Sequence, residues 1–229
     1  MQTIFLSPSD LAFLFLESPW AFHQKYRQNI KRPPLVLPKI FNAIDASIKM
    51  KYLDKNMSEV CSDMPNGILH SADQWVKSKP ITNPKYPDFE IIIRGKIDGT
   101  IKNPDGTYSV IDFKTTEINE NHLEKYIQQL SCYSYCLQNP NSSKDFSLPI
   151  SDKVGLFVFE PSNFSIDSNS NANLSGQIKY FEYEYDKNKF EDFIRNQIIP
   201  LLASDEPKPK DDEPYYVFLK QFGFEYTEE

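Results

Sequence analysis

Residues 94–116 read RGKIDGTIKNPDGTYSVIDFKTT, and this stretch decides the fold. Two segments with alternating apolar residues flank the sequence NPDG. Pro suits the first central position of a type I turn, and Gly suits the left-handed residue that closes a three-residue hairpin loop. The stretch therefore predicts a β-hairpin in which Asn103 pairs with Thr107.

The register of this hairpin brings two acidic residues together. Counting outward from Asn103 and Thr107 sets Asp98 opposite Asp112, and strand alternation sorts the other side chains into two faces. The polar face carries Arg94, Lys96, Asp98, Asp112 and Lys114. The apolar face carries Ile97, Ile111 and Phe113.

Adjacent carboxylates on a sheet repel each other unless a cation lies between them. A hard divalent ion such as Mg²⁺ prefers oxygen ligands and suits this pair. Lys114 lies beside the acids and could orient a reacting water or meet a phosphate oxygen. The acid-x-Lys pattern is weak alone, because it recurs at residues 206–208 beside a proline that a central strand would not accommodate.

Composition indicates an ordered protein with a substantial core. The chain has 229 residues, of which 40% are hydrophobic and 14% aromatic. We expect one domain over 1–229, with an N-terminal helical part at about 7–78, a core at about 88–202 and an aromatic tail at 203–229. The net charge of −7 argues against a broadly basic nucleic-acid-binding surface, although local basic patches remain possible.

The sequence predicts a cytoplasmic protein without a membrane segment. No apolar run is long enough to span a bilayer. The first 20 residues carry Asp10 and Glu17 and lack a basic leader, so they do not resemble a secretory signal. Three cysteines, an odd number, fit a reducing compartment.

Periodicity predicts helices over residues 7–16, 20–27, 37–52, 58–63, 71–77, 121–137 and 188–202. It predicts strands over residues 89–102, 107–116, 153–160 and 177–185. The polar stretch 161–176 is predicted to be a mobile loop. In the helix 37–52, a buried stripe is expected from Ile40, Phe41, Ile44 and Ile48. Asp45 lies beside that stripe and points either into a site or to the surface.

Two further groups of residues have open interpretations. A basic stretch holds Lys25, Arg27, Lys31 and Arg32. It is either an ordinary solvated surface or a contact for a phosphate backbone. Gln129 and Tyr133 are four residues apart, so they share one face of the predicted helix 121–137. That face is either structural or directed at the acidic pair.

These elements together resemble the nuclease motifs of the PD-(D/E)xK superfamily. The resemblance rests on Gly95-x-x-Asp98, then Asp112-x-Lys114, then Gln129-x-x-x-Tyr133. It is greatest for the RecB-type branch, which includes the AddB nuclease domain and the RecB-like exonucleases associated with CRISPR systems. It extends from about Leu6 to Tyr216.

The resemblance implies a restriction-endonuclease-like α/β core, with a mixed central sheet flanked by helices. It also implies hydrolysis of phosphodiester bonds in DNA with Mg²⁺ or Mn²⁺. The implied metal ligands are Asp98, Asp112 and the main-chain carbonyl of Phe113, and Lys114 takes the catalytic lysine's place. Gln129 and Tyr133 would orient the site or touch DNA, and Arg94 and Lys96 could receive its backbone. A helicase or CRISPR partner is left open.

The chain departs from that branch at two places. A His usually precedes the hairpin, and here Asp45 stands at its position, where a carboxylate could still complete a magnesium site. Several relatives hold an iron–sulphur cluster, but Ser18 and residues 213–216 replace its cysteines. We therefore expect no iron–sulphur cluster. Cys132 and Cys136 would pack inside a helix interface, and the aromatic tail would pack on the first helix.

Two rival functions remain on sequence grounds. The acidic charge and the missing His favour a catalytically inactive nuclease-fold module that binds DNA or serves in assembly. An enzyme of another class, such as a phosphatase, could use the same acids.

Overall fold

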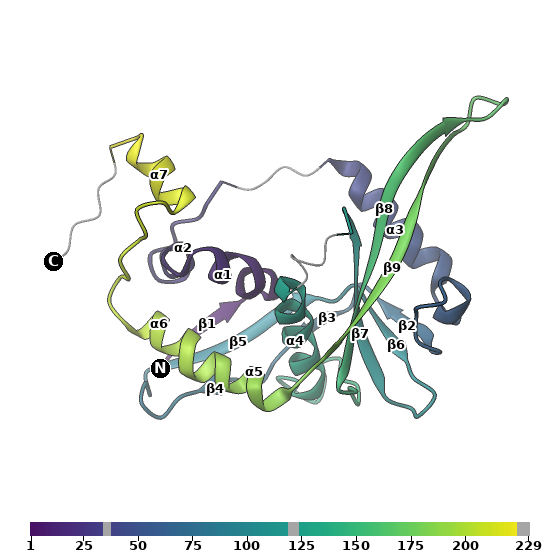
Figure 1. The fold of residues 1–229 in the computed structure, drawn as a ribbon. Coiled ribbons are helices and arrows are strands. Elements are labelled where there is room, and N and C mark those ends of the chain that lie inside the picture. Colours follow the sequence, from purple (N-terminus) through teal and green to yellow (C-terminus); the bar gives the residue numbers. More distant parts are fainter. Residues whose placement is uncertain (34–37, 119–123, 224–229) are drawn as a thin grey trace.

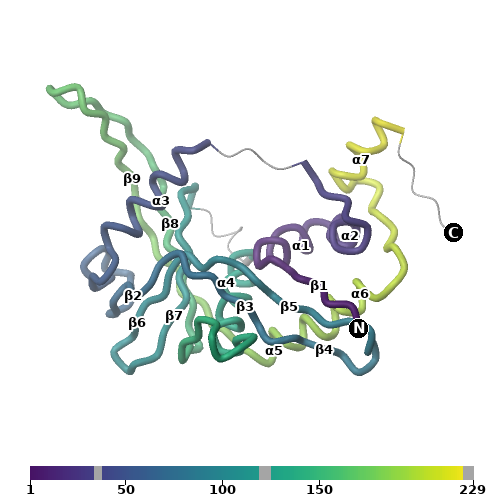
Figure 2. The backbone as a smooth tube through the Cα atoms, turned by 180° about the vertical axis from the view of Figure 1, so that it is seen from behind, coloured from purple at the N-terminus to yellow at the C-terminus, as the bar shows by residue number. Residues whose placement is uncertain are grey.

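Two mixed β-sheets meet at the predicted hairpin in the computed structural model, which describes residues 1–33, 38–118 and 124–223 (Figures 1 and 2). The larger sheet has the strand order β2-β6-β7-β8-β9. Its strands are β2 (Ile68–Ala72), β6 (Gly99–Lys102), β7 (Tyr108–Thr115), β8 (Lys153–Ile166) and β9 (Ala172–Glu184). The smaller sheet has the order β1-β5-β3, and β4 also pairs with β5. Its strands are β1 (Gln2–Leu6), β3 (Trp75–Lys77), β4 (Ile81–Thr82) and β5 (Phe89–Lys96).

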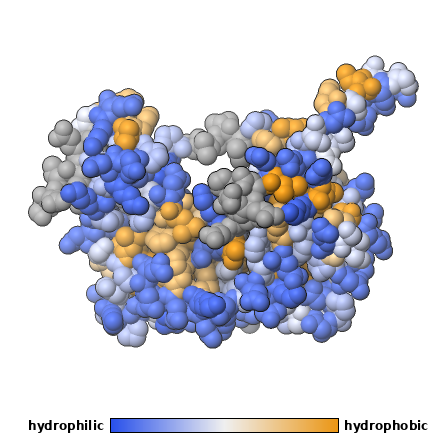
Figure 3. Space-filling model, in the orientation of Figure 1, coloured by the Kyte–Doolittle hydropathy of each residue, from blue (hydrophilic) through white to orange (hydrophobic). Residues whose placement is uncertain are grey.

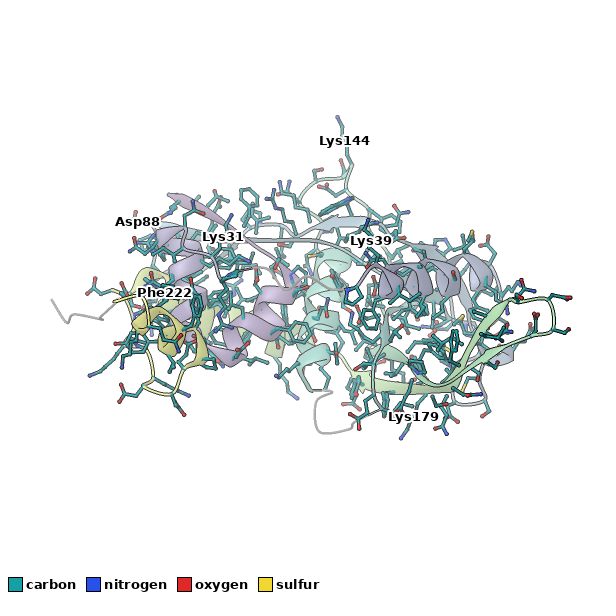
Figure 4. All side chains as sticks on the ribbon, turned by 90° about the horizontal axis from the view of Figure 1, so that it is seen from above. Lys31, Lys39, Asp88, Lys144, Lys179 and Phe222 are labelled. Carbon is teal, nitrogen blue, oxygen red and sulfur yellow. The ribbon has the colours of Figure 1, made fainter. Side chains whose placement is uncertain are left out.

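The centre of the larger sheet is a β7–α4–β8 unit. The two strands run parallel, and α4 (Glu124–Gln138) connects them. One face of the unit packs against α4, whose Leu130 and Cys136 share a core cluster with Val110 and Val154. On the opposite face Phe113 and Phe157 form a second cluster, which is covered by α3 (Lys39–Tyr52). In Figure 4, α4 lies between α3, which begins at Lys39, and the N-terminal helical segments near Lys31.

The strand predicted over 89–102 is wrong in one respect, because it breaks at Ile97 and Asp98. The main chain there bonds to another loop: Ile97 N donates to Gln74 O at 2.9 Å, and Asp73 N donates to Asp98 O at 3.3 Å. The chain therefore passes from β5 in the smaller sheet to β6 in the larger one. Ile97 packs with Val110 in the α4-side cluster, not with Ile111 as predicted.

The N-terminal region begins with a strand that the sequence did not reveal. β1 pairs in parallel with β5 and so extends the smaller sheet. The predicted helices follow it as four short segments, interrupted at Ser18 as expected. They span Asp10–Leu14, α1 (Phe15–Glu17), α2 (Pro19–His23) and Gln24–Gln28. Ser18 caps α2, because its Oγ accepts a hydrogen bond from Ala21 N at 3.0 Å.

Three predictions between residues 58 and 176 are wrong. Residues 71–77 form the end of β2 and all of β3 instead of a helix, because cross-strand pairing outweighs a weak helical pattern. The helix predicted over 58–63 is a single 3-10 turn at Met57–Glu59. Of the predicted loop 161–176, residues 161–166 belong to β8 and residues 172–176 to β9, and the two strands extend as an arm beyond the body (Figures 1 and 3). Phe164 and Ile166 near its end are exposed.

The C-terminal helix lies where it was predicted. Helix 188–202 is found as α5 (Lys187–Phe193), Ile194–Ile198 and α6 (Ile199–Ala203). The tail forms α7 (Pro214–Lys220), and its Tyr215 and Tyr216 pack against Trp20 of α2. The tail was predicted to pack on the first helix; it packs mainly on Trp20, which follows the break at Ser18, with Leu14 of the first helix beside it. Cys132 and Cys136 are buried in the α4 interface, as predicted. Among the described residues, no helix is long and apolar enough to cross a membrane.

Candidate active site

The hairpin register is confirmed. Asn103 N donates to Thr107 O at 2.8 Å, and Gly106 has a φ of 86°, the left-handed conformation that glycine tolerates best. The ladder of β6 and β7 pairs Gly99 with Ile111, which sets Asp98 across from Asp112 one step further from the loop. Local turn chemistry therefore places the two acids side by side.

Three side chains of the hairpin converge on one spot, as the sequence predicts. Lys114 Nζ lies 2.6 Å from Asp112 Oδ2 and 4.0 Å from Asp98 Oδ2. Asp98 Oδ2 also accepts a hydrogen bond from Phe113 N at 3.2 Å. Asp112 is only 2% exposed, because β7 is flanked by β6 and β8 and covered on both faces. The hairpin thus holds a buried acid, a less buried acid and a lysine in contact.

Burial and charge shift the two carboxyl groups in opposite directions. Burial raises the pKa of Asp112 to about 7, Asp98 adds to the rise, and Lys114 opposes it. For Asp98 burial also acts upward, but the neighbouring Lys114 and Lys49 prevail and lower its pKa. Near pH 7 the Asp112 carboxyl is therefore only partly ionised, and a cation bound at the pair would displace its proton.

A second lysine, which the sequence analysis overlooked, lies among the acids. Lys49 comes from α3, and its Nζ lies 2.9 Å from Asp98 Oδ1, 2.8 Å from Asp45 Oδ2 and 3.3 Å from Asp73 Oδ1. The residue is 4% exposed. Burial lowers its pKa, but the attraction of Asp98 and Asp45 outweighs that effect, so the pKa is raised overall. Its spacing of four residues from Asp45 was the signal in the sequence.

Helix α3 turns the later part of its predicted stripe toward the sheet and also buries a charged side chain that was not predicted. Ile40 is 56% and Phe41 37% exposed, so the predicted buried stripe is wrong at its first turn. Lys49 is buried instead. Further along the helix, Ile48 packs on the sheet, as predicted. Asp45 faces the site through its contact with Lys49, and burial raises its pKa although Lys49 opposes this. The apolar stripe alone did not predict the burial of Lys49, because this side chain is held by ion pairs with Asp45, Asp73 and Asp98.

Gln129 and Tyr133 lie on one face of helix α4, as the sequence predicts. Gln129 and Tyr133 are both buried, and Gln129 Nε2 lies 3.4 Å from the Tyr133 hydroxyl. The Tyr133 ring lies 3.0 Å from where a Cβ on Gly95 would be, so the glycine allows this close approach. Tyr126, which was not predicted, lies on the same helix with its ring centroid 5.6 Å from Lys114 Nζ.

Arg94 and Lys96 lie on β5 and not on one strand face with Asp98, because the strand breaks between them. Arg94 stacks over the Phe5 ring at 4.8 Å, and Lys96 Nζ lies 3.2 Å from Asp73 Oδ1. Both line an open cavity of about 640 Å³ that Tyr133 also borders. Five basic residues surround this cavity: Lys25, Arg27, Lys31, Arg94 and Lys96. Lys25, Arg27 and Lys31 of the basic stretch thus lie with Arg94 and Lys96 along one cavity, whereas Arg32 pairs with Glu17 and Glu213 instead.

The donor atoms at the acid cluster are of the type a hard divalent ion prefers. Within residues 1–33, 38–118 and 124–223, no three Asp, Glu, His or Cys side chains are grouped closely enough to hold a metal by themselves. Ammonium groups are interposed among the acids. However, Asp45 Oδ1 is a buried acceptor with no hydrogen-bond donor among the described residues, and Asp112 Oδ2 is a buried oxygen that contacts Lys114 Nζ at 2.6 Å. Such oxygens suit Mg²⁺, which needs few protein ligands because it retains several waters.

The main chain offers a further oxygen. A strand residue directs its N–H and its C=O to the same side. Phe113 N donates to Asp98. Its carbonyl therefore faces the same acid, which agrees with the implied ligand set. The residues present fit a divalent ion at the Asp98–Asp112 pair.

The two positions where cluster-binding relatives carry cysteines lie together. Ser18 and Glu213 border one cavity of about 90 Å³. Glu213 caps α7 through Tyr216 N at 2.6 Å and pairs with Arg32 at 2.7 Å, and Arg32 also pairs with Glu17 at 2.9 Å. A helix cap and ion pairs therefore connect the N-terminal helical segments to the start of α7.

Comparisons with known proteins agree with this architecture. A family model described as the PD-(D/E)XK nuclease superfamily matches residues 21–198. The match covers more than half of the chain, and the protein therefore belongs to the PD-(D/E)XK nuclease superfamily. The predicted restriction-endonuclease-like α/β fold class is confirmed. Nucleases of this superfamily typically use divalent metals such as Mg²⁺ or Mn²⁺.

The other comparisons add little. One similar solved structure is titled "Crystal structure of SSO0001". It shares 14% identity with this chain and has a TM-score of 0.43, and the match covers 89% of this chain and 78% of that one. No curated protein matches the chain.

Proposed function

We propose that the protein is a Mg²⁺- or Mn²⁺-dependent deoxyribonuclease that acts as an exonuclease of the RecB type. The convergence of Asp98, Asp112 and Lys114 beside an open basic cavity is the observation that carries this proposal. The assignment of DNA and of exonuclease action rests on the motif resemblance to the RecB-type branch. We place it in the cytoplasm because its three cysteines are free, with no disulfide between them.

In this proposal Asp98, Asp112 and the Phe113 carbonyl would hold the divalent ion, and Asp45 would contribute through Oδ1, which has no hydrogen-bond donor among the described residues. A bound ion would supply a Lewis acid for the phosphate and for an attacking water. Lys114 turns its ammonium toward the reacting oxygens, where it orients the attacking water and stabilises developing charge.

The groups around the acids receive and position the substrate. Gln129 and Tyr133 orient it from α4, where the two side chains contact each other and Tyr133 also borders the cavity. Arg94 and Lys96 neutralise backbone phosphates along the cavity, together with the basic residues of the N-terminal segments. This arrangement leads a strand past Tyr133 to the acidic pair. A helicase or CRISPR partner could deliver that strand.

A second candidate is a catalytically inactive nuclease-fold module for DNA binding or assembly. One observation favours it: ammonium groups of Lys49 and Lys114 already neutralise the acids. Such a module would bind DNA through the basic cavity without consuming it.

A digestion series separates these candidates. Purified protein is incubated with end-labelled single-stranded DNA, duplex DNA, RNA and a small aryl phosphate, in Mg²⁺, Mn²⁺ or chelator. The proposal predicts metal-dependent release of nucleotides from linear DNA and none from closed circular DNA, because an exonuclease needs an end. The matched control is Asp112→Asn, which retains the shape of the side chain.

Each other outcome points elsewhere. Cleavage of closed circles would replace exonuclease with endonuclease action. DNA binding without cleavage in either metal would favour the inactive module. Turnover of the aryl phosphate alone would indicate a phosphatase.

A further inference from the structure

The ammonium group of Lys49 is surrounded by carboxylates, as a bound metal cation would be. Its ammonium contacts three carboxylates from three different segments: Asp45 on α3, Asp73 before β3 and Asp98 at the hairpin. All three contacts lie between 2.8 and 3.3 Å. This spacing suits N–H···O bonds, whereas Mg²⁺ binds oxygen at about 2.0–2.1 Å. The acids are therefore spaced around an ammonium ion.

Burial keeps this ammonium in place. Lys49 is 4% exposed, in contrast to Lys51 and Lys39 on the same helix, which are exposed. A surface lysine can swing into solvent at little cost, but a buried charge that leaves its partners leaves uncompensated charges behind. Asp98 has one oxygen on Lys49 and the other on Phe113 N. Lys49 thus takes one of the coordination sites that a second ion would need.

We propose that Lys49 is a built-in cation that holds a position a divalent ion would otherwise fill, and so sets how many divalent ions the site accepts. The inference rests on the proposed function in one respect, namely that the Asp98–Asp112 pair binds a divalent ion. With Lys49 present, an ion has access to the Asp112 side of the pair. Without it, the oxygens of Asp45, Asp73 and Asp98 become available to a further ion.

The test counts bound metal and does not depend on cleavage. Mn²⁺ binding to wild type and to Lys49→Met is measured by calorimetry and by the electron paramagnetic resonance signal of free Mn²⁺. The Lys49→Met variant is expected to bind one more Mn²⁺ per chain than wild type. Its melting temperature should also rise more on addition of Mn²⁺, because a ligand that binds the folded state stabilises it.

Two further variants serve as controls. Lys51→Met removes the same charge from the same helix without touching the acids, and it should bind Mn²⁺ as wild type does. The double variant Lys49→Met with Asp73→Asn keeps the local charge unchanged if the single variant fails to fold. Asn tolerates the left-handed backbone of Asp73, whose φ is 58°. The double variant should still gain one Mn²⁺ through Asp45 and Asp98.

The outcomes separate this inference from the proposed function. An equal or smaller number of Mn²⁺ ions in both Lys49 variants would overturn the inference. A wild type that binds no Mn²⁺ would count against the proposed nuclease, yet a gain of one ion in Lys49→Met would still support the role of Lys49. A gain in Lys51→Met as well would also overturn it, because the effect would then be general charge.

Discussion

The site is assembled from two halves that differ in how their charges are balanced. In the hairpin half, Asp112 and Lys114 lie on β7, Asp98 lies at the break just before β6, and Asp112 is the most buried of the three. In the helix half, Asp45 and Lys49 come from α3, whose outer face is exposed. The hairpin half has two acids for one lysine; burial raises the pKa of Asp112 to about 7, and Asp98 adds to the rise although Lys114 opposes it. The helix half brings a lysine that contacts three acids.

This difference in charge balance indicates that the two halves of the site have separate functions. The hairpin half holds an unbalanced carboxylate pair, which is the chemical requirement for attracting a cation. The helix half supplies the positive charge of Lys49 and so limits how many divalent ions the acids can bind. The reaction should therefore depend strongly on the hairpin half, and the metal content should depend on the helix half.

The largest expected effect tests the two halves against each other. Asp112→Asn should lower metal-dependent cleavage of end-labelled DNA by more than about 100-fold, because even loss of an outer-shell partner of a metal costs about 10–100-fold. Asp45→Asn should cost about tenfold, because one of its oxygens is already bound by Lys49. Initial rates measure both, and circular dichroism confirms folding. Equal losses in the two variants would remove the distinction, and an active Asp112→Asn enzyme would refute the site.

A smaller effect is expected when the lysine of the hairpin half is replaced. Lys114→Met should lower the rate by about 100-fold, the usual cost of removing one group that stabilises transition-state charge. Mn²⁺ binding, measured by calorimetry, should persist, because Lys114 is not a ligand. Loss of metal binding in parallel with activity would mean that Lys114 acts by holding Asp112 in place.

The hairpin half was predictable from the sequence, and the helix half was not. Residues Asn103 to Gly106 encode the turn locally, and strand alternation then fixes the register of Asp98 and Asp112. The Gln129–Tyr133 face followed from helical spacing in the same way. These features depend on a few neighbouring residues.

The remaining features depend on contacts distant in sequence. The break at Ile97 arises because residues 73 and 74 bond to it, and nothing in the local pattern signals that loop. The strand β1 is stabilised by its pairing with β5, some 87 residues away. The buried side of α3 was predicted from apolar residues, whereas three carboxylates from other segments attract Lys49 inward. Apolar periodicity carries no information about such ion pairs.

The smallest expected effect is a dependence of stability on pH, and it isolates the unbalanced charge of the hairpin half. Asp112 retains its proton up to about pH 7 when folded but releases it near 3.8 when unfolded. Between these values the folded state binds more protons, so stability falls as pH rises, by at most about 1.4 kcal/mol per pH unit. The contribution is complete below about pH 4 and is lost once the pH exceeds 7.

Melting temperatures recorded in chelator from pH 4 to 8 measure this dependence, and Asp112→Asn is the reference because its amide cannot titrate. The melting temperature of wild type, relative to that of Asp112→Asn, should fall as the pH rises from 4 to 7 and should stay constant above pH 7. Divalent metal should reverse the trend, because an ion replaces the proton and its affinity rises with pH. A difference that stays constant with pH would mean that Asp112 is ionised throughout, and that Lys114 and Lys49 balance the hairpin half as fully as the helix half.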